Sequence, residues 1–325
     1  MDWHGLRVLI SGGSGFIGTN AVEYFTARGA TVRSLDYRPP QNPAHGSLWE
    51  ACDLLDHGRL SRMVQGFNPD YLIHLAARTD LRETRHLSGY AANFLGTEHL
   101  IDVCCGCGRL RRVLFASSRM VCQIGYVPRD ERDYGPPNLY GESKVRMEEV
   151  IRSAQAPFEW IIVRPTSIWG PWFDVPYKLF FTAIENRTYV HPVGRDPEKS
   201  FGFVGNTVYQ YDALLRAPRE EIQGATLYQC DYPPLRLREW AELIRLAMHL
   251  PPIRSAPLSL LRMAARAGDL AVSLGWSRVP LTTFRLNNLL TPMVYDTRRL
   301  AAMCGRLPFN LLEGVAMTVE WMRQR

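Results

Sequence analysis

A glycine-rich turn directly follows the first apolar segment of the chain and restricts the folds open to it. Residues 6–10 form a short apolar run of the kind found in buried strands, and the turn leads into a helical pattern that reaches Arg28. In this turn Gly12 permits a sharp reversal, Gly15 lets the backbone approach a pyrophosphate, and Gly18 lets the helix pack closely on the strand. The amides at the helix N-terminus remain available for phosphate oxygens. The pattern predicts a β-α-β unit that binds a dinucleotide.

An acidic residue at the end of the next strand indicates which dinucleotide is preferred. The expected second strand covers residues 31–36 and ends at Asp36, about twenty residues beyond the glycines. A carboxylate at this position binds the ribose 2′-hydroxyl and repels a 2′-phosphate. Arg38 would offset part of that charge, but we interpret it as a solvated loop arginine. The sequence therefore predicts NAD rather than NADP.

Tyr140 and Lys144 lie four residues apart, so on a helix they share one face. A tyrosine with an unperturbed pKa near ~10 is a poor base at neutral pH, and a neighbouring ammonium lowers that pKa. Ser118 follows a strand pattern and would hydrogen-bond the same substrate oxygen, although it could also simply cap the strand end. The glycine turn upstream favours a catalytic set over a chance spacing. We therefore expect Tyr140 as the acid/base, Lys144 as its cation and Ser118 as a hydrogen-bond donor.

Strand and helix signals alternate through much of the chain. Strands are expected at residues 6–10, 31–36, 71–75, 112–117, 160–164 and 226–230. This alternation predicts an α/β fold, a Rossmann-type doubly wound parallel sheet with right-handed crossovers. After Pro165 the sequence becomes rich in aromatic residues and prolines, with irregular spacing. We expect an NAD-binding domain over residues 1–170, joined by a returning strand within 204–230, and a smaller substrate-binding domain from 171–203 and 231–325.

Further segments follow the glycine turn in a recognisable order. They are Cys52-Asp53-Leu54, Ile73-His74-Leu75-Ala76-Ala77, Asn93-Phe94-Leu95-Gly96-Thr97, Phe115-Ala116-Ser117-Ser118 and Arg164-Pro165-Thr166. With Tyr140 and Lys144, these segments resemble the extended short-chain dehydrogenase/reductase family, specifically its NAD-dependent sugar-nucleotide epimerase/dehydratase group, typified by UDP-galactose 4-epimerase. The resemblance runs nearly end to end and includes a closing helix pair between Asp296 and Trp321. We interpret His74 as a packed strand-end histidine.

The resemblance implies an NAD site and a substrate site beside it. The residues implied to bind NAD are Gly12, Gly15, Phe16, Ile17, Gly18, Asp36, Asp53, Leu54, Leu75, Ala76, Ala77, Asn93, Ser117, Tyr140, Lys144 and Pro165. Those implied to bind the substrate are Arg78, Thr79, Ser118, Arg119, Thr166, Ser167 and Lys199. Lys199 stands where the epimerases place a diphosphate-binding arginine, and Ser167 replaces an asparagine common among them.

The residues after Ser118 separate branches of this family. The dehydratases carry Asp-Glu there, because elimination of water needs an extra acid and base, and Arg119 and Met120 cannot serve as that pair. We therefore expect an NAD-dependent epimerase of a nucleotide-linked sugar, in which Arg119 either contacts an anionic sugar or lies at the surface. The alternatives are a dehydrogenase or ketoreductase acting on a sugar nucleotide or a hydroxysteroid-like alcohol, and a non-catalytic NAD-sensing protein. Such sensors usually lose the tyrosine or lysine that this chain keeps.

Composition argues against other classes. The net charge is +6, but the basic residues are dispersed without a basic run, so we expect no nucleic-acid partner. An acidic diphosphate substrate together with NAD accounts for the mild basicity. The seven cysteines suit a reducing cytoplasm. Their cluster at Cys104, Cys105 and Cys107 has no further ligands nearby, so we expect no metal.

We also expect no membrane partner. No apolar run reaches the ~18 residues of a membrane span, and the chain begins with a strand pattern that leaves no room for a signal peptide. Residues 258–276 place Arg262 and Arg266 among apolar residues. We interpret this stretch as an amphipathic helix that packs on its own domain rather than as a membrane-surface segment.

Two expected helices bear on assembly. Those around residues 91–104 and 140–153 resemble the pair that forms a four-helix dimer interface in the family, which implies a homodimer. Val145, Val150 and Ile151 supply an apolar set for it, although the same set also suits core packing.

Overall fold

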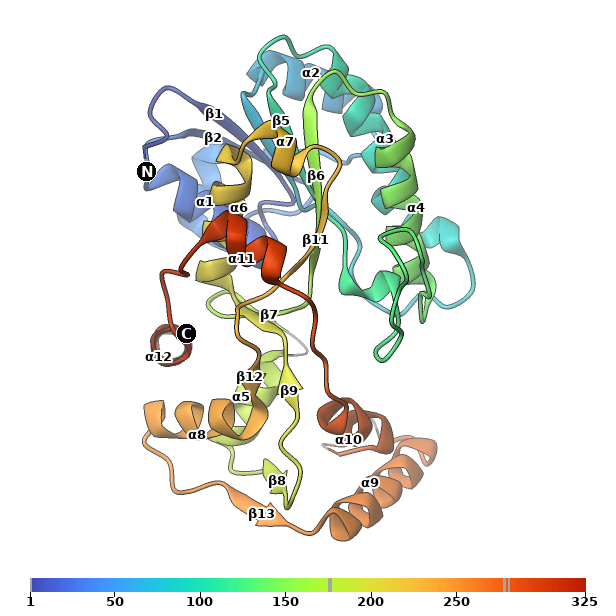
Figure 1. Cartoon of the computed structure of the whole chain (residues 1–325), viewed down its shortest axis with the longest axis vertical. Coiled ribbons are helices and arrows are strands. Elements are labelled where there is room, and N and C mark those ends of the chain that lie inside the picture. The colour runs from blue at the N-terminus through green and yellow to red at the C-terminus, as the bar shows by residue number, and fades with distance from the viewer. Residues whose placement is uncertain (1, 175–176, 277–278, 280) are drawn as a thin grey trace.

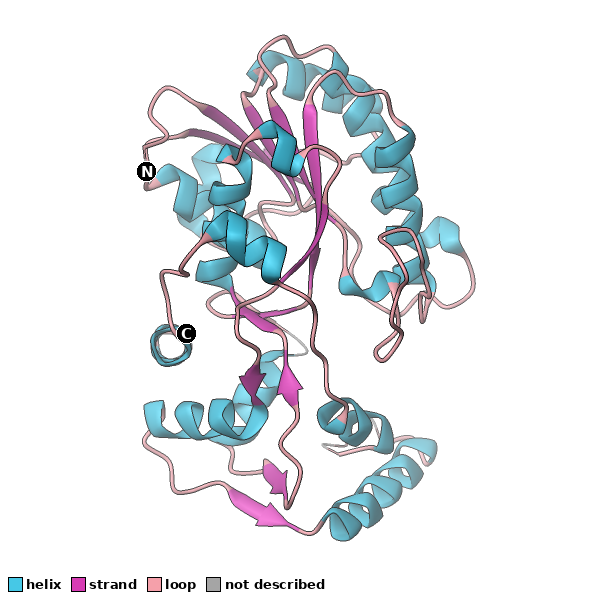
Figure 2. Cartoon of the chain, in the orientation of Figure 1, coloured by secondary structure: helices cyan, strands magenta, loops and turns pink. Residues whose placement is uncertain are grey.

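The computed structural model describes residues 2–174, 177–276, 279 and 281–325, and its main feature is a seven-stranded parallel sheet (Figures 1 and 2). The strand order is β11-β6-β5-β4-β1-β2-β3. The strands are β1 Arg7–Ser11, β2 Thr31–Asp36, β3 Trp49–Ala51, β4 Tyr71–His74, β5 Arg112–Ala116, β6 Glu159–Pro165 and β11 Thr226–Gln229. The expected Rossmann-type sheet and its six strands are confirmed. The short, half-buried β3 was not expected, because three residues carry too little pattern.

Helices cover both faces of the sheet. They are α1 Phe16–Thr26 and α6 Val204–Arg216 on one face, and α2 His57–Phe67, α3 Ala91–Cys105 and α4 Leu139–Ser153 on the other. Side chains alternate along a strand, so Val8 and Ile10 of β1 pack toward α1 and α6, while Leu9 packs toward α2, α3 and α4. Burial of both faces explains why the strands read as continuous apolar runs.

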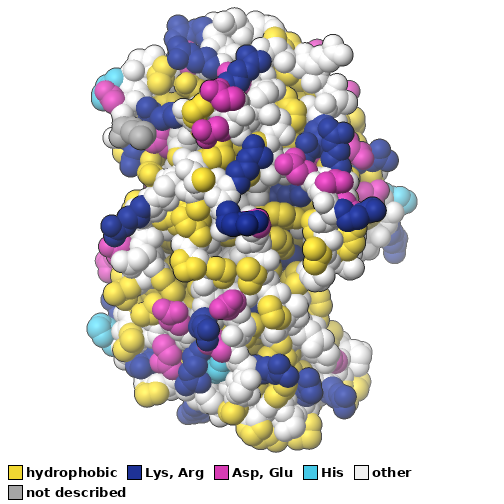
Figure 3. Space-filling view, in the orientation of Figure 1, with side chains coloured by type: hydrophobic (Ala, Val, Ile, Leu, Met, Phe, Trp, Pro, Cys, Tyr) yellow, Lys and Arg dark blue, Asp and Glu magenta, His cyan; other side chains and the backbone are white. Residues whose placement is uncertain are grey.

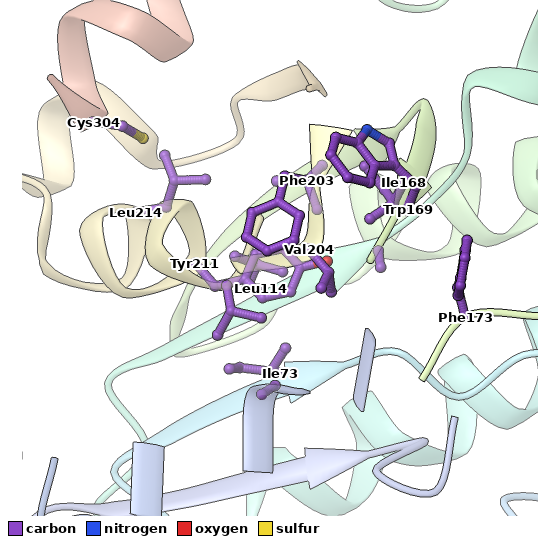
Figure 4. Close-up of a cluster of buried hydrophobic side chains, with 14 of the residues drawn as sticks. Ile73, Leu114, Ile168, Trp169, Phe173, Phe203, Val204, Tyr211, Leu214 and Cys304 are labelled. Carbon is purple, nitrogen blue, oxygen red and sulfur yellow. The ribbon is translucent and has the colours of Figure 1, made fainter. Parts of the chain in front are cut away.

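A smaller lobe lies at the carboxyl ends of the strands, below the sheet in Figure 1. Its elements are α5 Tyr177–Glu185, β8 Val190–Pro192, β9 Glu198–Lys199, β12 Leu235–Arg236, α8 Leu237–Ala247, β13 Arg254–Ala256, α9 Leu258–Ser273 and α10 Thr283–Leu290. The chain crosses into it through β7 Ser167–Trp169, which pairs with β10 Phe201–Phe203. Trp169 packs on Phe203 (Figure 4), with ring centroids 5.2 Å apart. It also packs on Trp240 of α8 at 5.4 Å, so the core continues between the lobes.

The C-terminal segment forms the expected closing helix pair. Its helices are α11 Arg298–Cys304 and α12 Leu311–Arg323. Cys304 of α11 joins the core beside Leu214 of α6 (Figure 4), whereas α12 packs against α8. Part of the segment 231–325, which we expected to lie in the smaller domain, therefore packs on the lobe that holds the sheet, because the chain returns there after α10.

The amphipathic helix expected at residues 258–276 is α9. Leu261 and Ala265 pack against Leu286 of α10, so the expected packing on its own lobe is confirmed. Within the described residues, no helix combines the length and apolar character needed to cross a bilayer. The remaining short helices are η1 Pro43–Leu48, η2 Leu87–Tyr90, η3 Arg119–Val121 and α7 Arg219–Ile222.

Candidate active site

The glycine turn connects β1 to α1 at the point where strand order reverses, which is where open α/β sheets bind ligands. Gly12 has φ +78°, and a side chain there would place its Cβ 2.5 Å from the Ala76 amide nitrogen. A Cβ at Gly18 would overlap the Gly12 carbonyl oxygen. Gly15 is the N-cap of α1 and provides no side-chain cap, so the amides of the first turn, which begins at Phe16 and Ile17, face outward as a cradle for phosphates.

Asp36 is buried at the end of β2 and is tied to the glycine turn. Its carboxylate accepts hydrogen bonds from the backbone amides of Ser14, at 3.2 Å, and Arg38, at 3.0 Å. Burial raises its pKa, and these amide bonds oppose the rise. The Arg38 side chain is exposed and lies over the Tyr37 ring at 5.3 Å, as expected for a solvated loop arginine. The carboxylate is thus placed beside the phosphate cradle, where a ribose would lie.

The segment after β3 packs on α3, and the segment after β4 borders the glycine turn. Leu54 is buried against Gly96 of α3, and Asp53 beside it is exposed. The Leu75 amide donates to the Ser11 carbonyl at 2.9 Å, which holds residues 75–77 against the glycines.

Two buried polar residues, Asn93 and His74, hold the segment around β4 in place through hydrogen bonds. Asn93 accepts from the Arg78 amide at 2.7 Å, and its own amide donates to the Arg78 carbonyl and to Ser143. The Asn93 side chain is thereby engaged with protein groups and positions the loop. His74 is fully buried between Ser11 and Thr97, which confirms its interpretation as a packed strand-end residue.

The proposed catalytic residues come together as expected. Ser118 follows β5, and its hydroxyl lies close enough to the phenol of Tyr140, in the first turn of α4, to oppose the rise that burial causes in the Tyr140 pKa. Helix α4 approaches the turn after Ser118 closely, because a Cβ at Gly141 would overlap the carbonyl oxygen of Met120. The Asn138 side chain caps α4 by accepting from the Gly141 amide at 2.9 Å.

Lys144 is buried one turn after Tyr140, but its ammonium acts differently from our expectation. Its Nζ donates to the Ala116 carbonyl at 2.8 Å. Burial lowers the pKa of Lys144 to about 7, while Glu148 opposes that shift. The pKa of Tyr140 is raised by burial, and the groups that oppose the rise are Ser118 and Arg119 rather than the lysine. The expected lowering of the Tyr140 pKa by Lys144 is therefore not seen in this structure.

These features fit a dinucleotide. Ser117, directly before Ser118, is buried, and its hydroxyl has no hydrogen-bond partner among the described residues. Pro165 ends β6 on the adjacent strand. The Ser117 hydroxyl and the amides at the N-terminus of α1 are therefore polar groups to which a bound cofactor could form hydrogen bonds. Elsewhere in the described part of the chain, no group of three His, Cys, Asp or Glu residues is placed to hold a metal ion.

Arg119 lies where the two lobes meet. Its positive charge is close enough to the Tyr140, Tyr177 and Tyr295 phenols to oppose the rise that burial causes in their pKa values. Lys199 also lies near Arg119. Its pKa is lowered to about 8, mainly by burial and secondly by the charge of Arg119. Figure 3 shows the surface hollowed between the lobe that carries α4 and the lobe that carries α9 and α10. The charge of Arg119 therefore lies between the Tyr140 phenol and the smaller lobe.

The other expected substrate residues are less directly placed. Ser167 is buried and accepts from the Tyr177 phenol, and the Thr166 hydroxyl donates to the Ser200 carbonyl. The Arg78 side chain donates to Asp80 and to the Gly89 carbonyl, and Thr79 beside it is exposed.

Lys199 is itself constrained. Its Nζ donates to the carbonyls of Asn288, at 2.8 Å, and Thr291, at 2.5 Å, both in or just after α10. Sequence reasoning missed Tyr177 and Tyr295, since neither belongs to a motif and only the fold brings them to Arg119.

Comparison with known proteins agrees with this geometry. The model of the NAD dependent epimerase/dehydratase family matches residues 8–227, about two-thirds of the chain. The protein belongs to this family. The match includes all or part of every strand of the main sheet, together with the glycine turn, Ser118, Tyr140 and Lys144, so NAD is the cofactor of this enzyme.

Relatives within the family have different activities. N-acetyl-alpha-D-glucosaminyl-diphospho-ditrans,octacis-undecaprenol 4-epimerase of Escherichia coli O157:H7 is 23% identical over 97% of this chain and 95% of its own. A 3-beta-hydroxysteroid dehydrogenase of Mycolicibacterium neoaurum is 28% identical over 76% of this chain and 72% of its own. UDP-glucose 4-epimerase of Thermotoga maritima, solved with UDP-glucose, has a TM-score of 0.74 at 17% identity and covers 98% of this chain and 99% of its own.

Proposed function

We propose that the protein is an NAD-dependent epimerase of a nucleotide-linked sugar. The observation that carries this proposal is the position of Arg119. Its positive charge lies near Tyr140 on one side and near Lys199 and Tyr295 on the other. A sugar nucleotide needs both features at one place, because its ring hydroxyl must reach the acid/base while its diphosphate needs positive charge. On this proposal the smaller lobe, which carries α5, α8, α9 and α10, holds the substrate.

The residues divide the chemistry among them. When bound, NAD would supply the hydride transfer, which removes a hydride from a ring carbon and returns it to the opposite face of the resulting ketone. Tyr140 takes the hydroxyl proton and returns it, and Ser118 donates a hydrogen bond to the same oxygen as it becomes a carbonyl. Lys144 would hold the nicotinamide ribose from the buried side of α4. Asp36 would bind the adenosine ribose at the other end of the cofactor.

A net dehydrogenase or ketoreductase is the second candidate. It draws support from the 28% identity with a hydroxysteroid dehydrogenase, whose alignment covers 76% of this chain. The epimerase alignment covers 97% of the chain and so includes the smaller lobe. The charge of Arg119 also favours an anionic substrate, since an apolar steroid-like alcohol gains nothing from a cation.

A panel of nucleotide sugars tests the proposal. Purified protein with NAD is incubated with each sugar, while NADH absorbance and the product isomers are followed. An isomer change without net NADH, lost in Tyr140→Phe, is expected. Net accumulation of NADH on one substrate would assign the protein to the dehydrogenases, and oxidation of hydroxysteroids alone would exclude the nucleotide sugar.

We further propose that the protein is a homodimer. The helices α3 and α4 pack side by side, and Val145 and Val150 are half-buried on α4, whereas Ile151 is buried in the core and unavailable. A cavity of about 550 Å³ lies on this outer surface, away from Tyr140, between α2, α3 and the end of α4. Light scattering at micromolar concentration should give the mass of a dimer, and a monomeric mass would contradict it.

The compartment is also a proposal. All seven cysteines are free in the structure, and six of them are buried. Unpaired thiols suit a reducing environment, so we propose that the protein acts in the cytoplasm.

A further inference from the structure

The helix α9 presents two apolar stripes, of which only one is covered. Leu261, Ala265 and Gly268 follow three- and four-residue spacing and are buried against the α10 side. A second stripe with the same kind of spacing faces away from the lobe. Its large members and their exposed fractions are Leu260 50%, Met263 59%, Leu270 62% and Leu274 72%. Contiguous exposed apolar side chains of this size mark an interaction surface more often than a solvated face.

Aromatic side chains extend this stripe at its C-terminal end. Trp276, just beyond α9, is 70% exposed, and Phe284 in the first turn of α10 is 73% exposed. The Thr283 amide donates to the Asp269 carboxylate at 3.0 Å, which holds the start of α10 beside the end of α9. Exposed tryptophan and phenylalanine beside a leucine stripe are typical of helices that lie in a membrane interface.

The charges on this part of the chain are mostly positive. Residues 251–290 contain five arginines and a single acidic residue, Asp269, which is engaged with α10. Arg262 and Arg266 are exposed one turn apart along the edge of the open stripe, and neither forms an ion pair with any residue that the structure describes. In Figure 3 hydrophobic and basic side chains meet along the lower edge of the molecule, where Figure 1 places α9.

We propose that α9 docks on an anionic lipid bilayer. The α9 surface, defined as Leu260, Met263, Leu270, Leu274 and Trp276 with Arg262 and Arg266, would lay its apolar stripe in the headgroup region while the arginines meet lipid phosphates. Its charge selects this occupant over a second copy of the chain, because an isologous contact would bring the same basic face against itself. The proposal departs from our sequence-based interpretation, in which this helix packs on its own domain and the protein has no membrane partner.

Docking there would place the cleft next to the bilayer. The docked lobe reaches the substrate side of the cleft through α10, whose Asn288 and following Thr291 accept the hydrogen bonds of Lys199. Lys199 in turn is close enough to Arg119 for that charge to shift its pKa. A substrate held at the membrane surface would therefore meet the cleft without leaving the interface.

Co-sedimentation of the full-length protein with vesicles tests the docking directly and needs no substrate. Vesicles of equimolar phosphatidylcholine and phosphatidylglycerol are compared with vesicles of phosphatidylcholine alone. We expect binding to the anionic vesicles that is at least about tenfold stronger and that weakens with added salt. The double variants Leu260→Gln/Leu270→Gln and Arg262→Gln/Arg266→Gln should each lose about tenfold or more in affinity.

Matched controls lie elsewhere on the chain. Leu246 and Leu312 are 51% and 55% exposed on α8 and α12, so Leu246→Gln/Leu312→Gln removes similar apolar surface. Arg59→Gln/Arg62→Gln removes the same charge from exposed arginines on α2. Both controls should bind vesicles like wild type, with folding checked by thermal melting.

Several outcomes would overturn the proposal. They are absence of wild-type binding to the anionic vesicles, equal losses in test and control variants, and a self-association in solution that Leu260→Gln/Leu270→Gln abolishes without any vesicle binding. If the leucine variant fails to fold, the two arginine variants decide alone, and equal binding by both refutes docking. Because no readout depends on turnover, failure here is distinct from failure of the proposed epimerase activity.

Discussion

The closest packing in the catalytic set is at Gly141, so Gly141→Ala should impair catalysis more than stability. The new Cβ would overlap the Met120 carbonyl oxygen and lie 3.0 Å from the Cβ of Pro136. Restoring an ordinary C···O separation of ~3.3 Å requires α4 and the turn at 119–121 to move apart by about 1 Å. Tyr140 is next to the substituted residue and Ser118 precedes the turn, so the displacement separates the two hydroxyls. A misplacement of about 1 Å can reduce the rate by roughly a hundredfold.

A second glycine provides the control. Gly66 lies in helix α2, and a Cβ there would meet nothing within 4 Å. Gly66→Ala should therefore leave turnover unchanged and stabilise the protein by roughly 0.5–1 kcal/mol, the ordinary helix preference for alanine. Turnover of both variants is measured on the nucleotide sugar that the panel identifies, with thermal melts alongside. Wild-type turnover in Gly141→Ala would show that the turn yields freely, and would refute the argument that this contact positions Tyr140.

Three further predictions concern single side chains. Tyr140→Phe should reduce turnover roughly a hundredfold to ten-thousandfold with little change in NAD affinity, and near-normal turnover would disprove the acid/base role. Lys144→Met should lower both the turnover and the NAD affinity. Asp36→Ala should narrow the preference for NAD over NADP in cofactor titrations, and a wild-type preference for NADP would count against its assignment. The folded-state pKa of Lys144 is lowered to about 7, so the unfolded chain binds more protons above that value and this lysine makes stability rise with pH. Urea unfolding should then favour wild type over Lys144→Met by more at pH ~9 than at pH ~6, and a difference independent of pH would contradict the shift.

Local patterns predicted the sheet and the cofactor half of the site. The glycines of the turn, the strand ending at Asp36 and the pair Tyr140 and Lys144 each follow from spacing along a single strand or helix. Such spacing fixes which side chains share a face, and the parallel sheet then aligns its carboxyl ends. The strand β3 was missed because three half-buried residues do not establish a period.

The substrate half of the site depended on tertiary structure. Arg119 meets Tyr177, Lys199 and Tyr295 only because the chain leaves the sheet at β7 and returns to it twice before its end. No local pattern encodes contacts between segments so far apart in sequence.

The same holds for electrostatics and for exposed surface. The four-residue spacing correctly placed Lys144 one turn from Tyr140, but burial and the Ala116 carbonyl decided the pKa directions of both groups. In α9 the sequence shows apolar residues around much of the helix, and only the packing of Leu261 on α10 determines which stripe is covered. Sequence by itself thus determined the fold and the chemistry that local geometry sets, whereas burial, which depends on every neighbouring segment, was decided by the folded chain.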